Sequence, residues 1–374
     1  MCRWHRTSSL NPKAAETPFV SNRHEQNTGT RDVREAHKFD VTRLEQYMCS
    51  HVESFRGPLR VSQFKGGQSN PTYLLEAESG NYVLRRKPPG KLLKSAHAVD
   101  REYRIISALY GADFPVPRPY ALCEDDEIIG TMFFIMEHVE GRIFWDLDLP
   151  NANPAGRAAL YDNVNETIAK LHSFDYAALG LEDFGKPGNY FARQISRWSR
   201  QYRSSETGSV RSMDALIDWL PENIPDDDSA SIVHGDFRLD NMIVHPTEPR
   251  VVAVLDWELS TIGHPLADFT YHLMAWQMPN IGIGSTGLLE KDLAALGIPD
   301  QDAYTALYCE RTGRPDGIAD RNFYSAFNFF RLAAILQGIA GRVRDGTAAS
   351  AHAQQAVKAV LPLADLGWQF AVEH

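Results

Sequence analysis

Only a few of the residues that define disulfide-rich and zinc-binding proteins occur in this sequence. Its 374 residues include four cysteines, which are widely separated and form no C-x-x-C pair: Cys2, Cys49, Cys123 and Cys309. Such spacing predicts neither a disulfide framework nor a zinc site. Because free cysteines persist where thiols are kept reduced, we expect a cytoplasmic protein.

Long apolar runs and an excess of basic residues are also absent. No apolar run approaches the ~20 residues that cross a bilayer, and the apolar region from Phe327 to Ile339 is interrupted by Arg331 and Gln337. Lys and Arg number 38 against 48 Asp and Glu, which gives a formal net charge of −10. We therefore expect a globular protein that binds neither membranes nor nucleic acid.

The first part of the chain differs in composition from the rest. Residues 1–36 are polar, rich in Ser, Thr, Asn and Arg, and show little apolar periodicity. Such a segment buries too little apolar surface to offset its conformational entropy, so we expect a disordered N-terminal extension. Folded sequence is expected from about Phe39, and the remaining length suits two lobes with a sizeable core.

The most informative stretch runs from Ser231 to Tyr271. It predicts a short strand that leads into an H-G-D sequence, followed by two apolar strands joined by a Pro-containing turn. Three acidic or amide side chains, Asp236, Asn241 and Asp256, stand at the ends of these predicted strands. Such groups at strand ends are candidates for chemistry rather than for packing.

The spacing of these three residues is typical of phosphoryl transfer. The step from Asp236 to Asn241 equals that in the loop H-R-D-x-x-x-x-N, where the Asp accepts the proton of the attacking hydroxyl. We predict Asp236 as the catalytic base, and Asn241 and Asp256 as oxygen ligands of Mg²⁺. Arg238 is either a stabiliser of the transferred phosphoryl group or a surface residue. The alternative for the Asp residues is a role in turns, with Asn241 as a strand cap.

At these residues the sequence resembles the aminoglycoside phosphotransferase and choline kinase family, a branch of the protein-kinase-like fold. The similarity rests on V-H-G-D-x-x-x-x-N, L-D-W-E and P-L-A-D, and it extends from about Phe39 to Trp368. The segments HGDFRLDNMIVHP, AVLDWELSTIGHPLAD, YCERTGR and FFRLAAILQG further resemble the kinase-like halves of bifunctional acyl-CoA dehydrogenases.

The resemblance implies an α+β, bilobal fold with a small antiparallel β N-lobe and a mainly helical C-lobe. The N-lobe would comprise residues 37–138 and bind the nucleotide. The C-lobe would comprise residues 139–374 and carry the catalytic loop, the metal site and the acceptor site.

A glycine-containing turn between two predicted strands is the first candidate for nucleotide binding. In kinases such a turn places backbone N–H groups over the ATP phosphates. The turn lacks the G-K-[ST] ending of a Walker A motif, and the alternative is an ordinary hairpin turn. Its candidate residues are Gly66, Gly67, Gln68, Ser69 and Asn70.

The next predicted strand ends in basic residues. The resemblance implies that Arg85 contacts the ATP phosphates, with Lys87 as the alternative, and that Glu102 on the following helix is its ion-pair partner. A solvated basic strand end is the other interpretation of this segment.

Two further predicted strands, 127–129 and 131–136, form an expected hairpin. The resemblance implies that its second strand leads into the hinge between the lobes, where the backbone meets the adenine. The candidates there are Met136, Glu137 and Val139.

Several polar residues are expected to support the catalytic loop without taking part in proton transfer. The resemblance implies that Asp268 holds the loop from below, and we expect His234 to anchor it through hydrogen bonds. His172 is expected to pack behind the site. The family often has Asp where this chain has His264, so no carboxylate role is expected at that position.

The sequence thus predicts an ATP- or GTP-dependent phosphotransferase that uses Mg²⁺ and transfers the γ-phosphoryl group to a hydroxyl of a small molecule. The resemblance favours a hydroxyacyl-CoA as acceptor, and an aminoglycoside, another antibiotic or a choline-like alcohol are alternatives. A nucleotide-binding pseudokinase that serves as an interaction module is the alternative from another class. A protein kinase is disfavoured because D-F-G and A-P-E are absent. Monomer and homodimer both remain open.

Overall fold

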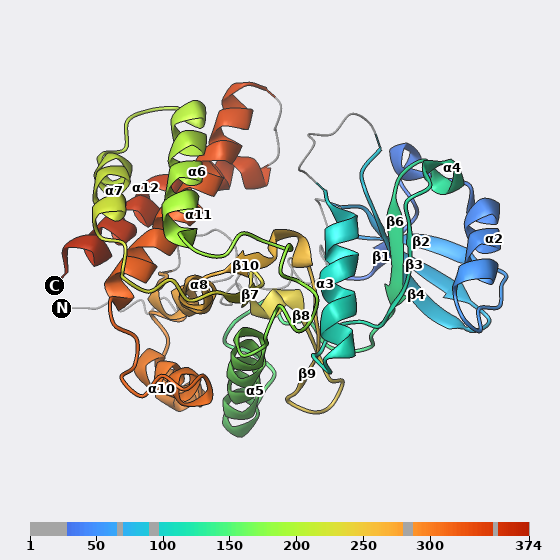
Figure 1. Ribbon diagram of the computed structural model, residues 1–374, viewed down its shortest axis with the longest axis horizontal. Helices are drawn as coiled ribbons and strands as arrows, with labels where there is room; N and C mark the ends of the chain where they lie inside the picture. Colours follow the sequence, from blue (N-terminus) through green and yellow to red (C-terminus); the bar gives the residue numbers. More distant parts are fainter. Residues whose placement is uncertain (1–27, 66–69, 90–96, 280–286, 347–350, 374) are drawn as a thin grey trace, which may run out of the picture.

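The computed structural model describes residues 28–65, 70–89, 97–279, 287–346 and 351–373. Two lobes lie side by side, one built on a β-sheet and the other mainly helical (Figure 1). This arrangement confirms the predicted α+β class with a small antiparallel lobe and a helical lobe. Within the described ranges, no helix is both long and apolar enough to cross a membrane.

The N-lobe contains a six-stranded antiparallel sheet with the strand order β1-β2-β3-β4-β6-β5. The helices α2 (Val41–His51) and α3 (Val99–Gly111) belong to the same lobe. The strands are β1 (Thr30–Arg31), β2 (Arg60–Phe64), β3 (Thr72–Ala77), β4 (Gly80–Arg86), β5 (Pro119–Cys123) and β6 (Phe133–Glu137).

The central strand β4 is covered on both faces. Successive side chains of a strand point to opposite faces, and Leu84 packs in one buried cluster with Met48 of α2. Val83 packs in the other cluster with Ile106 of α3. Arg85 follows Val83 by two residues, so the same alternation directs its side chain toward α3.

The folded N-lobe begins earlier than the sequence predicted. Thr30 and Arg31 pair with Phe64 and Gln63 of β2, and the Arg34 N–H donates to the Gln63 side chain at 3.2 Å. Residues 28–36 are therefore structured, although the extension was expected to reach residue 36. Strand pairing at this edge uses backbone groups, which leave no apolar periodicity in the sequence. Residues 1–27 lie outside the described ranges.

The expected strand over 127–129 is wrong. Residues Asp126–Ile129 form a short helix, α4, because Asp125 accepts the Glu127 N–H and Gly130, with φ +86°, ends the turn. The antiparallel partner of β6 is β5, which precedes α4.

The C-lobe is built from helices that pack around one large apolar core. Asn153 caps α5 and Pro154 occupies its first turn, where the missing N–H of proline costs no hydrogen bond. The helices are α5 (Pro154–His172), α6 (Tyr190–Ser205), α7 (Arg211–Glu222), α8 (Pro265–Gln277), α9 (Leu293–Leu296), α10 (Gln301–Arg311), α11 (Arg321–Arg344) and α12 (Ala351–Val372).

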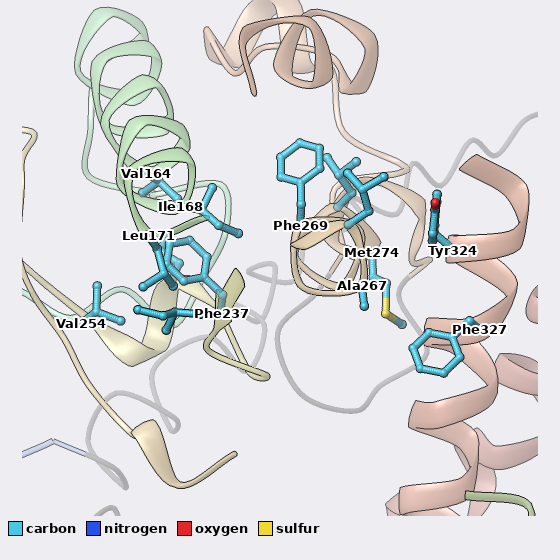
Figure 2. Packing of buried hydrophobic residues seen from close by; sticks show 14 of the residues in the cluster. Val164, Ile168, Leu171, Phe237, Val254, Ala267, Phe269, Met274, Tyr324 and Phe327 are labelled. Atoms are coloured by element: carbon cyan, nitrogen blue, oxygen red, sulfur yellow. The ribbon is translucent and has the colours of Figure 1, made fainter. Parts of the chain in front are cut away.

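The core joins α5 to the catalytic segment and to α8. Val164, Ile168 and Leu171 form a stripe on α5 that faces Phe237, which lies immediately after Asp236 (Figure 2). Burying such side chains contributes roughly 1.5–3 kcal/mol each. The catalytic loop is therefore fixed from below by the core of the helical lobe.

Two short β-ladders frame the catalytic loop. Strand β7 (Ser231–Val233) pairs with β10 (Thr261–Gly263), and β8 (Met242–Val244) forms the predicted hairpin with β9 (Val251–Val254). The single turns η2 (Leu239–Asn241) and η3 (Trp257–Leu259) lie between these strands.

Between the lobes, β6 ends at Glu137 and Arg142 forms a bridge with Val244 of β8. The proposed boundary between residues 138 and 139 falls in this connection and stays a prediction.

Candidate active site

The backbone of the catalytic loop is held by a buried carboxylate on α8. Asp268 Oδ2 accepts the His234 N–H at 2.7 Å, and Oδ1 accepts the Gly235 N–H at 2.8 Å. The Oδ2 atom also lies 3.3 Å from His172 Nε2. Burial would raise the pKa of Asp268, but His172 and the loop amide outweigh it and lower the pKa. Asp268 and His172 thus lie where the sequence placed them.

His234 links the loop to the strand that precedes Asp256. Its side chain is fully buried, with Nδ1 3.1 Å from the Asp236 N–H and Nε2 2.9 Å from the Leu255 carbonyl. Since a carbonyl can only accept, Nε2 carries the proton and Nδ1 accepts from Asp236. With both nitrogens in structural hydrogen bonds, His234 anchors the loop, as expected.

The tight turn before Asp236 requires glycine. Gly235 has φ +83°, and a Cβ at this position would lie 2.8 Å from the Leu259 carbonyl oxygen. An L-residue would meet both a strained backbone and a clash here. The turn brings the Asp236 side chain out of the core.

Asp236 lies among three polar side chains, two from its own loop and one from α8. Tyr271 donates to Oδ1 at 2.7 Å, and Arg238 Nε lies 3.1 Å from the same oxygen. Asn241 donates to Oδ2 at 3.0 Å. Burial would raise the pKa of Asp236, but Arg238, Tyr271 and the other polar neighbours outweigh it and lower the pKa. The carboxylate is therefore ionised near neutral pH, as a hydrogen-bond acceptor for a hydroxyl must be.

The amide of Asn241 is oriented by Asp236. Its Nδ2 donates to the Asp236 backbone oxygen at 2.9 Å as well as to the carboxylate. Because both bonds use the nitrogen, the amide oxygen points elsewhere and can act as a ligand. The Asn241 carbonyl also accepts the Leu255 N–H at 2.8 Å, which brings Asp256 next to Asn241.

Arg238 extends from the loop toward acidic neighbours. Its Nη2 lies 3.3 Å from Asp240 Oδ2, and its side chain is 44% exposed. The guanidinium thus lies beside the carboxylate of Asp236, and the phosphate-contacting role of Arg238 stays a prediction.

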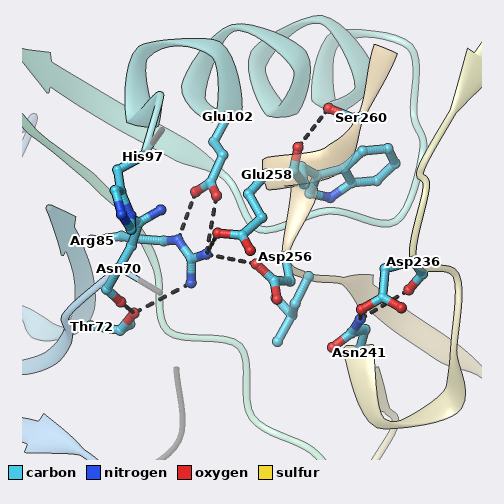
Figure 3. Close-up of polar contacts among 12 residues, drawn as sticks. Asn70, Thr72, Arg85, His97, Glu102, Asp236, Asn241, Asp256, Glu258 and Ser260 are labelled. Atoms are coloured by element: carbon cyan, nitrogen blue, oxygen red, sulfur yellow. Dashed lines mark hydrogen bonds and ion pairs between the residues drawn. The ribbon is translucent and has the colours of Figure 1, made fainter. Parts of the chain in front are cut away.

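Figure 3 shows a second cluster, in which Arg85 lies among three carboxylates. Arg85 Nε lies 2.7 Å from Glu102, and Nη2 lies 2.6 Å from Asp256 and 3.5 Å from Glu258. Burial would lower the pKa of Arg85, and the three carboxylates outweigh it and raise the pKa. The ion pair with Glu102 implied by the resemblance is present.

Of the two basic candidates on this strand, Arg85 faces the acidic cluster. Lys87 Nζ instead lies 3.6 Å from Asp100 at the start of α3, where both side chains are partly exposed. Arg85 is thus the cation that the fold brings to Asp256, and Lys87 is turned toward a surface ion pair.

The donor set fits a divalent cation. Glu102, Asp256 and Glu258 each offer a carboxylate oxygen, and these oxygens lie within 4.8 Å of one another. Asp256 is partly exposed and has φ +66°, a left-handed conformation that Asp tolerates better than most residues. Together with the Asn241 amide oxygen, these hard oxygen ligands are the type that Mg²⁺ prefers.

A cavity of about 670 Å³ lies between the lobes. Its volume is in the range of small-molecule and cofactor sites. The candidate residues that line it are Arg85, Glu102, Met136, Glu137, Val139, Asn241 and Asp256, together with apolar side chains such as Val83, Phe134 and Trp257.

The three hinge candidates have different backbone environments. Met136 pairs with both β4 and β5, and the Glu137 N–H donates to the Arg118 carbonyl at 2.8 Å. Within the ranges that the structure describes, the Val139 N–H makes no hydrogen bond to another protein group. Val139 can therefore offer its backbone to a ligand, and Met136 can offer its side chain.

The candidate phosphate turn is described only at one end. Gly66, Gly67, Gln68 and Ser69 lie outside the described residues. Asn70 is fully buried, and its Oδ1 lies 2.8 Å from His97 Nδ1. This contact connects the end of the turn to His97, two residues before α3.

Sequence reasoning missed two residues of the site, Tyr271 and Arg331. Arg331 on α11 is 7% exposed, donates to the Gly235 carbonyl at 2.6 Å, and lies over the Tyr271 ring at 5.1 Å. A single arginine within an otherwise apolar helical segment is a signal that could have identified it, since buried charges need partners. Tyr271 follows Asp268 by three residues and so shares its helical face.

In a comparison with known protein families, residues 60–314 match the phosphotransferase enzyme family. The chain is 45% identical over 346 residues to acyl-CoA dehydrogenase family member 10 of Mus musculus, covering 92% of this chain and 32% of that protein. It is 44% identical over 345 residues to family member 11 of Gallus gallus, covering 91% of this chain and 44% of that protein. The chain thus spans less than half the length of these relatives.

Solved structures agree with the fold. A crystal structure from Ralstonia eutropha, provisionally described as an aminoglycoside phosphotransferase, is 56% identical with a TM-score of 0.82, covering 89% of this chain and 98% of that chain. The aminoglycoside phosphotransferase APH(4)-Ia, in a ternary complex with AMP-PNP and hygromycin B, is 16% identical with a TM-score of 0.58, covering 89% of this chain and 100% of that chain. At that identity the second likeness concerns the fold alone.

Proposed function

This chain belongs to the phosphotransferase enzyme family, and we propose that it transfers the γ-phosphoryl group of ATP or GTP to the hydroxyl of a hydroxyacyl-CoA. The observation that carries the proposal is the position of Asp236, whose ionised carboxylate accepts a 3.0 Å hydrogen bond from Asn241, a residue that lines the cavity. Asp236 would orient the acceptor hydroxyl and receive its proton late in the reaction.

Other residues of the site would bind the nucleotide. The Val139 backbone and the Met136 side chain would contact the base, and Arg85, held by Glu102, would contact the phosphates. Gly66, Gly67, Gln68, Ser69 and Asn70 would cover the phosphates from the N-lobe side, and Glu137 would border the hinge.

Asn241 and Asp256 would hold Mg²⁺, which neutralises charge on the phosphate oxygens when bound. Arg238 would leave Asp236 and contact the transferred group, where the negative charge spreads in the transition state. Its exposed position beside the loop permits this movement.

The acceptor class rests on the relatives. Their names place them among the acyl-CoA dehydrogenases, and the segment similar to this chain makes up less than half of each protein. A hydroxyl-bearing acyl-CoA is a compound that both parts of such a protein could bind. The structural likeness at 56% identity favours an aminoglycoside as the second candidate acceptor.

The proposal is tested by nucleotide binding followed by transfer. Thermal shift with ATP or GTP and Mg²⁺ should show stabilisation of about 2.7 kcal/mol at 100-fold the Kd. Phosphoryl transfer is then measured by mass spectrometry against hydroxyacyl-CoAs of different hydroxyl position, aminoglycosides and choline. We expect product only with the hydroxyacyl-CoAs.

Two variants separate binding from chemistry. Asp236→Asn should retain the nucleotide-dependent shift and lose roughly 10²–10⁴-fold in kcat, and Asp256→Asn should lose the Mg²⁺-dependent part of the shift. Asp100→Asn, which changes a partly exposed ion pair with Lys87, is the matched control. Transfer to an aminoglycoside alone would select the second candidate, and no shift with either nucleotide would favour an interaction module.

A further inference from the structure

The carboxylate of Asp236 receives a hydrogen bond from a side chain that the sequence motif does not contain. Tyr271 on α8 donates its hydroxyl to Oδ1 at 2.7 Å, and the tyrosine side chain is largely enclosed. Burial and the Asp236 charge both raise the pKa of Tyr271, so the phenol stays protonated and acts as the donor.

Helix α8 therefore reaches the loop at two points. Asp268 accepts the backbone N–H groups of His234 and Gly235, and Tyr271, one helical turn later, holds the side chain of Asp236. Residues three apart share one helical face, so a single rigid helix positions both the loop backbone and the carboxylate.

Helix α11 fixes Tyr271 in turn. The Arg331 guanidinium lies 5.1 Å from the centre of the Tyr271 ring and donates to the Gly235 carbonyl at 2.6 Å. A planar guanidinium stacked on an aromatic ring and hydrogen-bonded at its edge is strongly oriented. The ring of Tyr271 is thus held between α11 and the loop that it supports.

The other donors to Asp236 have additional roles in the proposed reaction. Arg238 shares Oδ1 with Tyr271, and Asn241 binds Oδ2 and would also coordinate Mg²⁺. A carboxylate has about four acceptor positions, so departure of Arg238 frees one of them for the acceptor hydroxyl. Tyr271 is the donor that remains at Oδ1 after this departure.

We propose that Tyr271 is a positioning residue, which holds the plane of the Asp236 carboxylate when Arg238 turns to the transferred phosphoryl group. This inference rests on the proposed phosphotransferase function of the same site. It assigns to Tyr271 a role in kcat rather than in binding, because its hydroxyl contacts Asp236 and does not line the nucleotide cavity.

The first test uses Tyr271→Phe, which removes one oxygen and keeps the ring beneath Arg331. We expect kcat to fall about ten-fold, as for loss of a hydrogen bond to a charged group, with an unchanged KM for the nucleotide.

Tyr161→Phe is the matched control for this test. Tyr161 is buried in the same lobe and donates its hydroxyl to the Leu147 carbonyl at 2.6 Å, away from Asp236. It should lose stability without the fall in kcat. A wild-type kcat in Tyr271→Phe would overturn the inference.

A second test needs no turnover. The loss of Tm caused by Tyr271→Phe is measured in the wild-type background and in Asp236→Asn. If the hydroxyl acts on the Asp236 charge, the loss should be clearly smaller in the Asp236→Asn background, whereas additive losses would overturn the inference. Failure of the wild type to transfer phosphoryl groups would contradict the proposed function, and the Tm cycle would still decide on the Tyr271 contact.

Discussion

Arg85 of the N-lobe lies 2.6 Å from Asp256 of the C-lobe, measured between Nη2 and Oδ1. Asp256 is also the proposed Mg²⁺ ligand, so the guanidinium and a bound metal would compete for one carboxylate. Glu102 and Glu258 contribute further negative charge to the same cluster. The contact thus joins the two lobes at the proposed metal site.

Replacement of Arg85 by Met should expose this competition. Glu102, Asp256 and Glu258 would lose their shared cation, and we expect a loss of about 3 kcal/mol in the free energy of unfolding. Mg²⁺ alone should restore part of the stability, because the three carboxylates then form an unneutralised cation site. The measurement is a thermal shift with and without MgCl₂.

Lys87→Met is the control for Arg85→Met. Lys87 makes only a partly exposed ion pair with Asp100, and such pairs contribute about 1 kcal/mol or less. An equal response of wild type and Arg85→Met to MgCl₂ would contradict the competition.

Asp268→Asn should destabilise the protein and reduce its activity. The amide would turn one acceptor into an NH₂ group facing the N–H of His234 or Gly235, and a buried unsatisfied pair of this kind costs about 3 kcal/mol. Chemical denaturation measures the first effect and kcat the second. Asp300→Asn is the control, since Asn caps the start of α10 about as well as Asp. Equal unfolding free energies for the two variants would show that the loop needs no carboxylate.

Because His272 is buried, we expect the protein to lose stability in mild acid. Burial lowers the pKa of this residue from 6.5 to about 4, because the fully enclosed ring is penalised when it is charged. The folded pKa lies below the unfolded one, so the stabilisation is present above pH 6.5 and is lost as the pH falls toward 4. The linked free energy is on the order of 3 kcal/mol.

This pH dependence is measured as the change in unfolding free energy between neutral pH and about pH 4.5. In His272→Gln the change should be smaller than in the wild type, although the variant starts less stable because the contact with the Tyr304 hydroxyl at 2.9 Å is altered. His51→Gln, at an exposed position, should follow the wild-type curve. Parallel curves for His272→Gln and the wild type would refute the assignment.

Gly235→Ala tests the tight turn before Asp236. The left-handed backbone costs about 1–2 kcal/mol for an L-residue, and the added Cβ would lie 2.8 Å from the Leu259 carbonyl oxygen. We expect the loss in unfolding free energy to exceed the cost of the left-handed backbone alone. We also expect a lower kcat, because the clash displaces Asp236. Gly313→Ala is the control, since Gly313 has φ +68° but nothing within 4 Å of an added Cβ. Equal destabilisation of both variants would mean that the Leu259 backbone can move away from the added Cβ without a loss of unfolding free energy.

The errors made from the sequence have physical causes. The segment 127–129 contains the β-branched Ile128 and Ile129, which favour a strand, yet Asp125 and Gly130 enclose a single helical turn. A short apolar segment fits the apolar periodicity of both a helix and a strand, so the flanking residues decide which of the two forms. The strand formed by Thr30 and Arg31 left no pattern in the sequence, because these residues join the sheet through backbone hydrogen bonds.

The sequence by itself indicated the catalytic loop and the residue types that it carries, because the spacing of Asp236, Asn241 and Asp256 is local and chemical, and its resemblance to a known family implied the fold class. Tertiary structure alone decided which side chains meet these residues. Tyr271 and Arg331 reach Asp236 and Gly235 from two helices that are distant in sequence. No local pattern encodes such contacts, because they depend on how the helices pack around the shared core. This packing determines which polar groups a buried side chain can reach for hydrogen bonding.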